Sequence, residues 1–204
     1  MNHNTTPRAG NDANSQNSRQ LRNLSAVERI EWAYRRFGEA LVLNSSFGPQ
    51  SIVCLSLAIE VHPRVPVVMI ELPGPEYDMQ RLYRDYLKST LELNLHIVRA
   101  QDNAGKKAAL CEFLHSQGSQ ASISGIRRQQ TRNRARKDLL ESDRDYPAMM
   151  RIHPIADWSD NRTWRYIERL PDEWRHPGYR RGLRSIGGVL LDADQVKTEC
   201  GLHL

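Results

Sequence analysis

The chain has few cysteines: among its 204 residues only Cys54, Cys111 and Cys200 carry a thiol. Three widely separated cysteines do not form the paired framework that stabilises small secreted domains. Isolated thiols are typical of proteins from a reducing compartment, so we expect a cytoplasmic protein.

Long hydrophobic runs are also missing. No stretch approaches the roughly 18 consecutive apolar residues of a membrane-spanning helix, so we expect no membrane partner. The first twenty residues are rich in Asn, Ser and Thr and lack the apolar core of a signal peptide. We expect residues 1–22 to be a disordered leader, 23–185 one globular domain, and 186–204 a flexible C-terminal tail.

The charge of the chain is modest overall, at +5, but it is unevenly distributed. One basic group without an acid between its members comprises Arg127, Arg128, Arg132, Arg134, Arg136 and Lys137. A second group comprises Arg175, His176, Arg180, Arg181 and Arg184. Such clusters indicate a polyanionic ligand or, alternatively, a solvated surface. The sequence has no helix-turn-helix, zinc or RNA-recognition signature, which favours a nucleotide over nucleic acid.

The pattern of apolar residues alternates between strands and helices. Ser25 and Glu28 form a capping box that opens a helix ending near Phe37, before Gly38. Further helices are expected at 51–60, 76–93, 106–116 and 161–170, with Pro49 at the start of the first and Asp160 capping the last. Strands are expected at 40–44, 65–72, 95–98, 121–126 and 150–155. This alternation predicts a single-domain α/β fold, a mostly parallel sheet with helices on both faces.

Two short motifs follow predicted strands. The turn Ser45-Ser46-Phe47-Gly48 leads from one strand into a helix, where hydroxyl groups and free N–H groups can bind an anion. The motif Ser124-Gly125-Ile126-Arg127-Arg128, with Arg134 beyond it, follows another strand. Arginine suits bidentate binding of phosphate or sulfate. Ligands of open α/β sheets bind at the carboxyl ends of strands, so we expect both motifs to bind the ligand.

The last residues of the chain contain a candidate nucleophile. Cys200 stands in the sequence Glu199-Cys200-Gly201-Leu202-His203, four residues before the end. Terminal segments are usually mobile, and an accessible thiol is a reactive one. The alternative is a cysteine without a role in a solvated tail.

Taken together, these motifs resemble one family, the phosphoadenylyl sulfate (PAPS) reductases. The resemblance covers about 25–204 and has the same motif order. It is carried by Ser45-Ser46-Phe47-Gly48, Ser124-Gly125-Ile126-Arg127-Arg128 with Arg134, Pro154-Ile155-Ala156-Asp157-Trp158 with Asn161-Arg162-Thr163, His176-Pro177 and Glu199-Cys200-Gly201-Leu202-His203.

The resemblance implies an adenine nucleotide α-hydrolase-like fold and a chemistry. The Cys200 thiolate would attack the phosphosulfate of 3′-phosphoadenylyl sulfate and form an S-sulfonate, as part of assimilatory sulfate reduction. Thioredoxin or glutaredoxin, as electron donor, would then release sulfite. A homodimer is a further expectation from the family. The implied substrate-binding residues are Ser45, Ser46, Phe47, Gly48, Gly125, Arg127, Arg128, Arg134, Asp157 and His203.

The number of cysteines separates two branches of this family. The adenylyl sulfate branch holds an iron–sulfur cluster, which needs about four thiolates. This chain has only three cysteines in all. We therefore expect no bound metal or other cofactor, and the 3′-phosphorylated nucleotide as substrate.

Departures from the family keep an alternative open. Where the family has an Asp-Thr-Gly-type turn, this chain has Glu71-Leu72-Pro73-Gly74. The alternative is a catalytically impaired, nucleotide-binding relative that serves as a sensor or accessory protein. A sulfurtransferase or ATP pyrophosphatase is less favoured, because the Ser45-Ser46-Phe47-Gly48 turn lacks the Gly-Gly-x-Asp-Ser loop expected for ATP cleavage.

Overall fold

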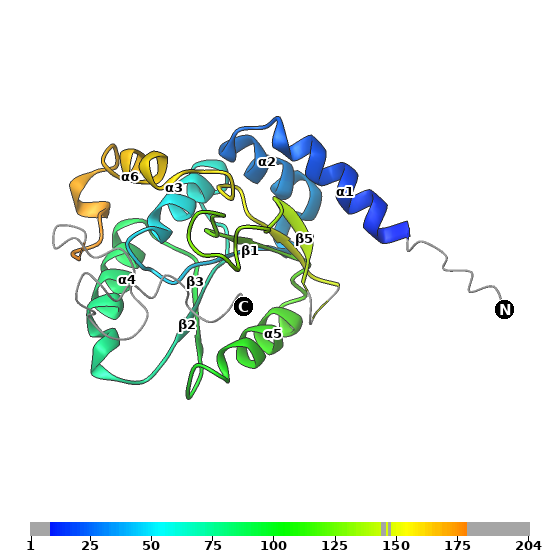
Figure 1. Cartoon of the computed structure of the whole chain (residues 1–204). Coiled ribbons are helices and arrows are strands. Elements are labelled where there is room, and N and C mark those ends of the chain that lie inside the picture. The colour runs from blue at the N-terminus through cyan, green and yellow to red at the C-terminus, as the bar shows by residue number, and fades with distance from the viewer. Residues whose placement is uncertain (1–8, 144–145, 147, 179–204) are drawn as a thin grey trace.

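The computed structural model describes residues 9–143, 146 and 148–178 (Figure 1). Its helices are α1 (Ala9–Arg22), α2 (Ala26–Phe37), α3 (Ser51–Val61), α4 (Asp78–Thr90), α5 (Lys106–Ser116) and α6 (Asp160–Ile167). Its strands are β1 (Leu41–Asn44), β2 (Val67–Glu71), β3 (Leu95–Arg99), β4 (Ala121–Ser124), β5 (Leu140–Ser142) and β6 (Met150–Ile152). Short 3₁₀ turns cover Gly38–Ala40, Pro75–Tyr77 and Asp172–Trp174.

The strands form one six-stranded sheet in the order β3-β2-β1-β4-β6-β5. All neighbouring pairs are parallel except β5, which runs antiparallel to β6 at the edge. This arrangement confirms the predicted α/β fold with a mostly parallel sheet. Within the ranges described, no helix combines the length and apolar character needed to cross a bilayer.

Alternate residues of the central strands pack into two cores on opposite faces of the sheet. In β1, Leu41 and Leu43 join the larger core together with residues of α2, α3, α4 and α6. Val42 of the same strand joins the smaller core, where Leu110 and Leu114 of α5 cover the other face. The near-continuous apolar runs of the strands follow from this burial on both sides.

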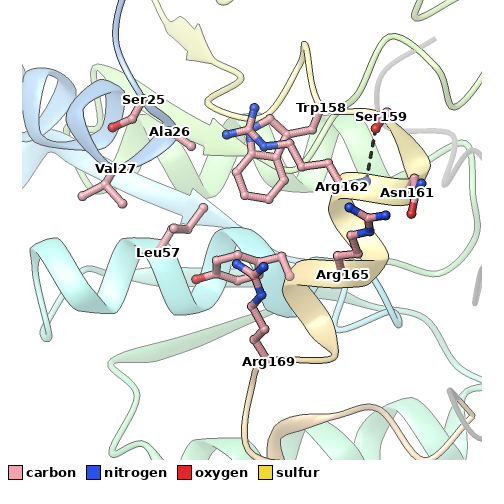
Figure 2. A pocket seen from close by; sticks show the side chains of 11 residues that line it. Ser25, Ala26, Val27, Leu57, Trp158, Ser159, Asn161, Arg162, Arg165 and Arg169 are labelled. Atoms are coloured by element: carbon pink, nitrogen blue, oxygen red, sulfur yellow. Dashed lines mark hydrogen bonds between the residues drawn. The ribbon is translucent and has the colours of Figure 1, made fainter.

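The ends of two helices show how local sequence sets their start. At α2 the predicted capping box is present: the Ser25 hydroxyl accepts the Glu28 N–H, and the Glu28 carboxylate accepts the Ser25 N–H. At α6 the prediction was wrong by one residue, because Ser159 and not Asp160 caps the helix. The Ser159 hydroxyl accepts the N–H of Arg162 at 3.1 Å (Figure 2).

Two elements differ from expectation. The edge strand β5 was not predicted, since a three-residue strand shows no periodicity of its own. The prediction of disorder is wrong for Ala9–Arg22, which is helical. Leu21 of α1 is fully buried, and its carbonyl accepts a 2.9 Å hydrogen bond from Arg29 Nε. Tertiary contacts at its carboxyl end therefore stabilise a helix whose polar composition alone would not.

We predict that Leu21→Ala lowers the free energy of unfolding by about 2–5 kcal/mol, because it leaves a cavity in the larger core. The matched control is Leu82→Ala on α4, where the side chain is 72 % exposed and the expected change stays within about 0.5 kcal/mol. Urea denaturation followed by circular dichroism measures both. Equal effects of the two substitutions would contradict the docking of α1.

Candidate functional site

The two predicted binding motifs meet at the point where the strand order reverses. From β1 the chain adds β2 and β3 on one side, whereas β4 and β6 lie on the other. The last residues of β1 and β4, Asn44 and Ser124, are register partners. The turns that follow them are therefore neighbours at the carboxyl edge, which is where open α/β sheets bind ligands.

The serine turn is a tight, mostly buried structure. Ser45 is 3 % exposed, and its hydroxyl accepts the N–H of Phe47 at 3.2 Å. Phe47 has a φ of 50°, a left-handed conformation unusual for a non-glycine residue. Its ring is buried in the larger core, so only its backbone faces the turn. The Ser46 carbonyl accepts a hydrogen bond from Gln80 of α4, and the Gly48 carbonyl accepts the Ser51 hydroxyl.

Arg127 is the central charged residue of the neighbouring turn. Its side chain is 1 % exposed. Nη2 lies 2.7 Å from Gln50 Oε1 and 2.6 Å from the Asp160 carboxylate. Among the residues that the structure describes, the buried atoms Nε and Nη1 have no hydrogen-bond partner. Buried polar groups are nearly always hydrogen-bonded, so two unpaired guanidinium nitrogens indicate a position prepared for an anionic ligand.

Gln130 joins the other basic side chains to this position. Its Oε1 accepts the backbone N–H of Arg127 at 3.0 Å and an N–H of Arg134 Nη1 at 2.6 Å. Its Nε2 lies 3.4 Å from Gln50 Oε1. Gly125 is close to α3, since a Cβ there would lie 3.7 Å from Cys54 Sγ. The structure thus brings Ser45, Gly125, Arg127 and Arg134 of the predicted site together.

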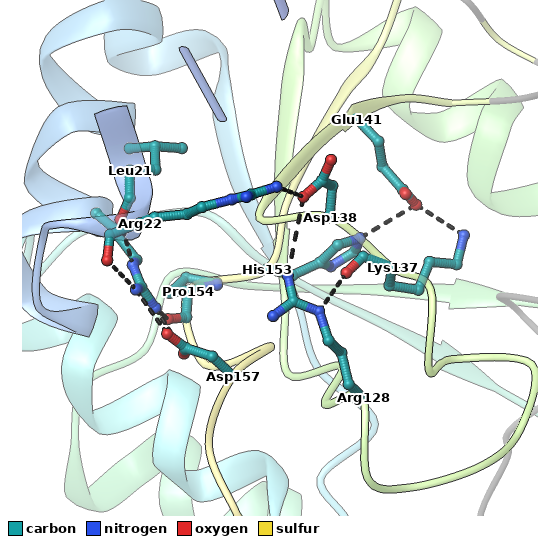
Figure 3. A network of polar contacts seen from close by, with 10 residues as sticks. Leu21, Arg22, Arg128, Lys137, Asp138, Glu141, His153, Pro154 and Asp157 are labelled. Atoms are coloured by element: carbon teal, nitrogen blue, oxygen red, sulfur yellow. Dashed lines mark hydrogen bonds and ion pairs between the residues drawn. The ribbon is translucent and has the colours of Figure 1, made fainter. Parts of the chain in front are cut away.

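Arg128 points in a different direction and braces its own loop. Its backbone N–H donates to the Ala156 carbonyl at 2.9 Å, and its Nε donates to the Lys137 carbonyl at 2.7 Å. Its Nη2 lies 3.8 Å from Asp138, which also pairs with Arg22 of α1 (Figure 3). These contacts tie the end of β4 to the segment that follows β6.

Asp157 is held by a buried arginine. Its two oxygens accept hydrogen bonds of 2.7 and 2.8 Å from Arg29, whose side chain is 4 % exposed and also donates to the Pro154 carbonyl (Figure 3). Partial burial alone would raise the pKa of Asp157, but the hydrogen bonds and charge of Arg29 outweigh it and lower the pKa. The carboxylate is thus committed to anchoring the loop to α2.

A second set of polar contacts, part of which Figure 3 shows around His153, Glu141 and Lys137, reaches the end of β4 through Ser124. Buried His153 lies 2.7 Å through Nδ1 from the Ser124 hydroxyl and 3.4 Å through Nε2 from Glu141, which also pairs with Lys137 at 2.7 Å. Burial lowers the pKa of His153, so the ring is neutral at pH 7. Burial opposes ionisation of Glu141, but His153 and Lys137 bring its pKa down to about 2.

The second basic group has a structural role where it is described. Arg175 donates to the carbonyls of Ile167, Glu168 and Leu170 at the end of α6. His176 is buried against the ring of Tyr83, with centroids 4.6 Å apart, and burial lowers its pKa to about 4. It is therefore uncharged at neutral pH.

The predicted residues Cys200 and His203 lie outside the described residues. Of the other cysteines, Cys54 is buried, which raises the pKa of its thiol to about 12. Cys111 is half-buried, and burial also raises its pKa. Among the residues that the structure describes, no group of three or more His, Cys, Asp and Glu side chains is placed to hold a metal ion.

Sequence reasoning missed the partners of Arg127. Gln50 and Gln130 stand inside the two turns, and Asp160 belongs to the third motif, yet none was predicted to act. The available signal was the position of Gln50 directly before α3, next to the serine turn. No pattern in the sequence indicates that the Gln50 side chain reaches Arg127, in the turn that follows β4.

The comparisons with known proteins decide the family. The model of the phosphoadenosine phosphosulfate reductase domain matches residues 40–193. The chain belongs to this family. A phosphoadenosine 5′-phosphosulfate reductase of Alkalilimnicola ehrlichii is 32 % identical, over 91 % of this chain and 89 % of the relative. One from a Synechococcus species is 31 % identical, over 91 % of this chain and 94 % of the relative.

Solved structures show the same fold at much lower identity. Candida glabrata FMN adenylyltransferase, in complex with FAD and pyrophosphate, has a TM-score of 0.66 at 14 % identity and covers 84 % of this chain and 68 % of its own. Yeast FAD synthetase has a TM-score of 0.61 at 17 % identity, with 84 % and 70 % covered. These likenesses confirm the α/β fold with a mostly parallel sheet.

We predict that Asp157→Asn lowers the free energy of unfolding at pH 7 by about 1.5–3 kcal/mol, because it leaves the buried Arg29 guanidinium without its carboxylate. The folded pKa of Asp157 lies below 3.8. Its stabilisation is therefore complete above about pH 3.8 and is lost as the pH falls through the folded pKa. The deficit of the variant should accordingly shrink in acid.

Urea denaturation at pH 7 and at a series of acidic pH values measures this dependence. The control is Asp138→Asn, whose carboxylate is 45 % exposed and pairs at 3.4 Å or more, with an expected loss within about 1 kcal/mol. A deficit in Asp157→Asn that does not change with pH would refute the ion-pair explanation.

Proposed function

We propose that the chain reduces 3′-phosphoadenylyl sulfate to sulfite and adenosine 3′,5′-bisphosphate, in assimilatory sulfate reduction. Membership of the reductase family supports this reaction. The observation that carries the proposal is the buried guanidinium of Arg127, two of whose nitrogens are unpaired among the described residues. This side chain lies where the strand order of the sheet reverses. A phosphosulfate supplies the anionic oxygens that such a group requires.

The site would bind the anionic part of the nucleotide. Ser45, Ser46 and Gly48 would present hydroxyl and backbone groups beside it, with Phe47 supplying only its backbone. Gly125 would let the β4 turn approach closely. Arg127 would pair with the phosphosulfate while Arg134, held through Gln130, adds positive charge beside it. A desolvated guanidinium stabilises charge that develops on the leaving phosphate more strongly than a solvated one does.

Three of the predicted contact residues remain to be placed in this proposal. Arg128 and Asp157 would position the site through the loop contacts described above, without direct contact to the nucleotide. His203, beside the nucleophile in sequence, would stay a candidate for the sulfuryl group.

In the chemical step, the Cys200 thiolate attacks the sulfur of the phosphosulfate. The S–O bond to the phosphate breaks, and adenosine 3′,5′-bisphosphate leaves with the bonding electron pair. The result is a Cys200 S-sulfonate. A dithiol protein, thioredoxin or glutaredoxin, then attacks the Cys200 sulfur. Sulfite departs with the electron pair of the S–S bond, and the second thiol closes the disulfide of the donor and frees Cys200.

The described cysteines support Cys200 as the nucleophile. A thiol with a pKa of about 12, as at Cys54, holds almost no thiolate at neutral pH. Burial also raises the pKa of the Cys111 thiol and so disfavours its thiolate. Arginine charges would favour the thiolate of a cysteine that reaches the strand ends.

One observation favours a nucleotide-binding relative without turnover. Glu71, at the end of β2, is occupied by ion pairs with Arg84 and Arg81 and lies 3.5 Å from Arg99. The acidic side chain at the end of β2 is therefore committed to salt bridges where the family usually carries an Asp-Thr-Gly turn. Binding without sulfite release would support this second function.

We predict that the reduced protein, incubated with 3′-phosphoadenylyl sulfate, gains one sulfonate on Cys200 and releases sulfite when thioredoxin is added. Cys200→Ser should abolish both the adduct and sulfite while nucleotide binding stays intact. Peptide mass spectrometry and a sulfite assay measure the two products, and Cys111→Ser is the control with full activity. Sulfite formation by Cys200→Ser would disprove the mechanism, whereas binding without any adduct would favour the relative without turnover.

We predict that Arg127→Met weakens nucleotide binding by roughly tenfold or more, because it removes a desolvated cation from the site. The free energy of unfolding should change by no more than about 1 kcal/mol, since the buried guanidinium is only partly satisfied and Asp160 is 55 % exposed. Calorimetric titration and urea denaturation measure the two quantities, with exposed Arg136→Met as control. A variant that binds normally would refute the role of Arg127.

A further inference from the structure

A surface cavity of about 480 Å³ lies away from the strand ends, between α2, α3 and α6. One wall carries Arg162 and Arg165 of α6 and Arg169 of the turn that follows it, and the facing wall carries Val27 of α2 and Leu57 of α3 (Figure 2). None of these residues belongs to the nucleotide site proposed above. The volume is within the range of about 300–1,000 Å³ that is usual for small-molecule pockets.

The arginines of this wall have no acidic partner among the described residues. The ion pairs of the described residues involve other arginines: Asp160, two residues before Arg162, is bound to Arg127, and Glu168, which directly precedes Arg169, forms none with these three. Arg162 and Arg165 stand at positions i and i+3 of α6 and share one helix face, and Arg169 lies in the turn directly after the helix. Like charges at such spacing repel one another, and a bound anion would relieve this repulsion.

The orientation of Arg162 is fixed by an aromatic ring. Its guanidinium carbon lies 4.4 Å from the centroid of Trp158, which is buried and also packs against Tyr166 at 5.4 Å (Figure 2). A guanidinium stacked on a ring keeps its N–H groups at the edge, free to donate. The cation wall is thus partly preorganised and is not only a set of mobile side chains.

The amino end of α2 closes the cavity on the side of Ser25 and Ala26. The Ser25 hydroxyl is already used by the Glu28 N–H in the capping box. The anionic groups of a ligand would therefore be bound by the arginines, and its apolar part would lie against Val27 and Leu57.

We propose that this cavity is a second binding site, for a small molecule that carries two phosphate groups. Guanidinium forks pair with phosphate oxygens in two parallel hydrogen bonds, and a spacing of one helical turn lets neighbouring arginines bind neighbouring phosphates. An acidic protein segment is the competing occupant. The volume of about 480 Å³, which matches small-molecule pockets, favours the small molecule.

The test uses inorganic pyrophosphate as the probe and the full chain with Arg127→Met, so that binding at the strand-end site is weakened in every protein compared. Isothermal titration calorimetry should show one binding event in this protein. Adding Arg165→Glu and Arg169→Glu should weaken that event by roughly tenfold or more. The matched control adds Arg64→Glu, an exposed arginine before β2, and should change affinity by less than about twofold.

Circular dichroism of each variant confirms that the exposed substitutions leave the fold intact. Equal affinities of the Arg165→Glu/Arg169→Glu and Arg64→Glu proteins would overturn the proposal. Absence of pyrophosphate binding would overturn it as well, and so would binding of an acidic decapeptide in its place. Because 3′-phosphoadenylyl sulfate and Cys200 take no part in the experiment, its outcome is independent of the proposed reductase activity.

Discussion

The parallel pairing of β1 with β4 is the constraint on which the site depends. The two strands are distant in the sequence, yet Asn44 and Ser124 are brought side by side as register partners. Because the strand order reverses between them, the chain leaves the sheet toward different elements after each strand. The serine turn and the Arg127 turn therefore face a common space. Every other contact of the site, including that of Gln50 with Arg127, presupposes this pairing.

Two buried arginines show how the same side chain serves structure or binding. Arg29 is 3 % exposed and is bound on every nitrogen, by Asp157 and by the carbonyls of Leu21 and Pro154. Arg127 is 1 % exposed, but its Nε and Nη1 are unpaired. A fully paired guanidinium stabilises the fold, whereas an incompletely paired one gives up stability and is prepared for a ligand. This contrast, and not the charge of the segment, supports the proposal that Arg127 binds the ligand.

The sequence predicted the elements whose signals are local. The capping box of α2, the bounds Lys106–Ser116 of α5 and the positions of the two turns all follow from short-range pattern. Long-range contacts could not be predicted in this way. Asp157 matches a family motif, but its partner Arg29 lies 128 positions away. The helix α1, whose sequence is largely polar, likewise depends on the burial of Leu21. Matching the family motifs found the segments that meet at the site. It could not distinguish residues proposed to bind the ligand from residues that hold the loops in place.

Hydrogen bonds and an ion pair connect the motifs to one another. The Arg128 N–H donates to Ala156, the Asp160 N–H donates to Gln129, and the Asp160 carboxylate pairs with Arg127. The loop after β4 and the segment after β6 are therefore joined on both sides of the guanidinium. Because Asp157 and Arg29 fix that segment to α2, a displacement there would reach Arg127 through Asp160 without any contact to the ligand. The position of Arg127, the cation proposed to bind the ligand, is thus set by a helix on the larger core and not by its own turn alone.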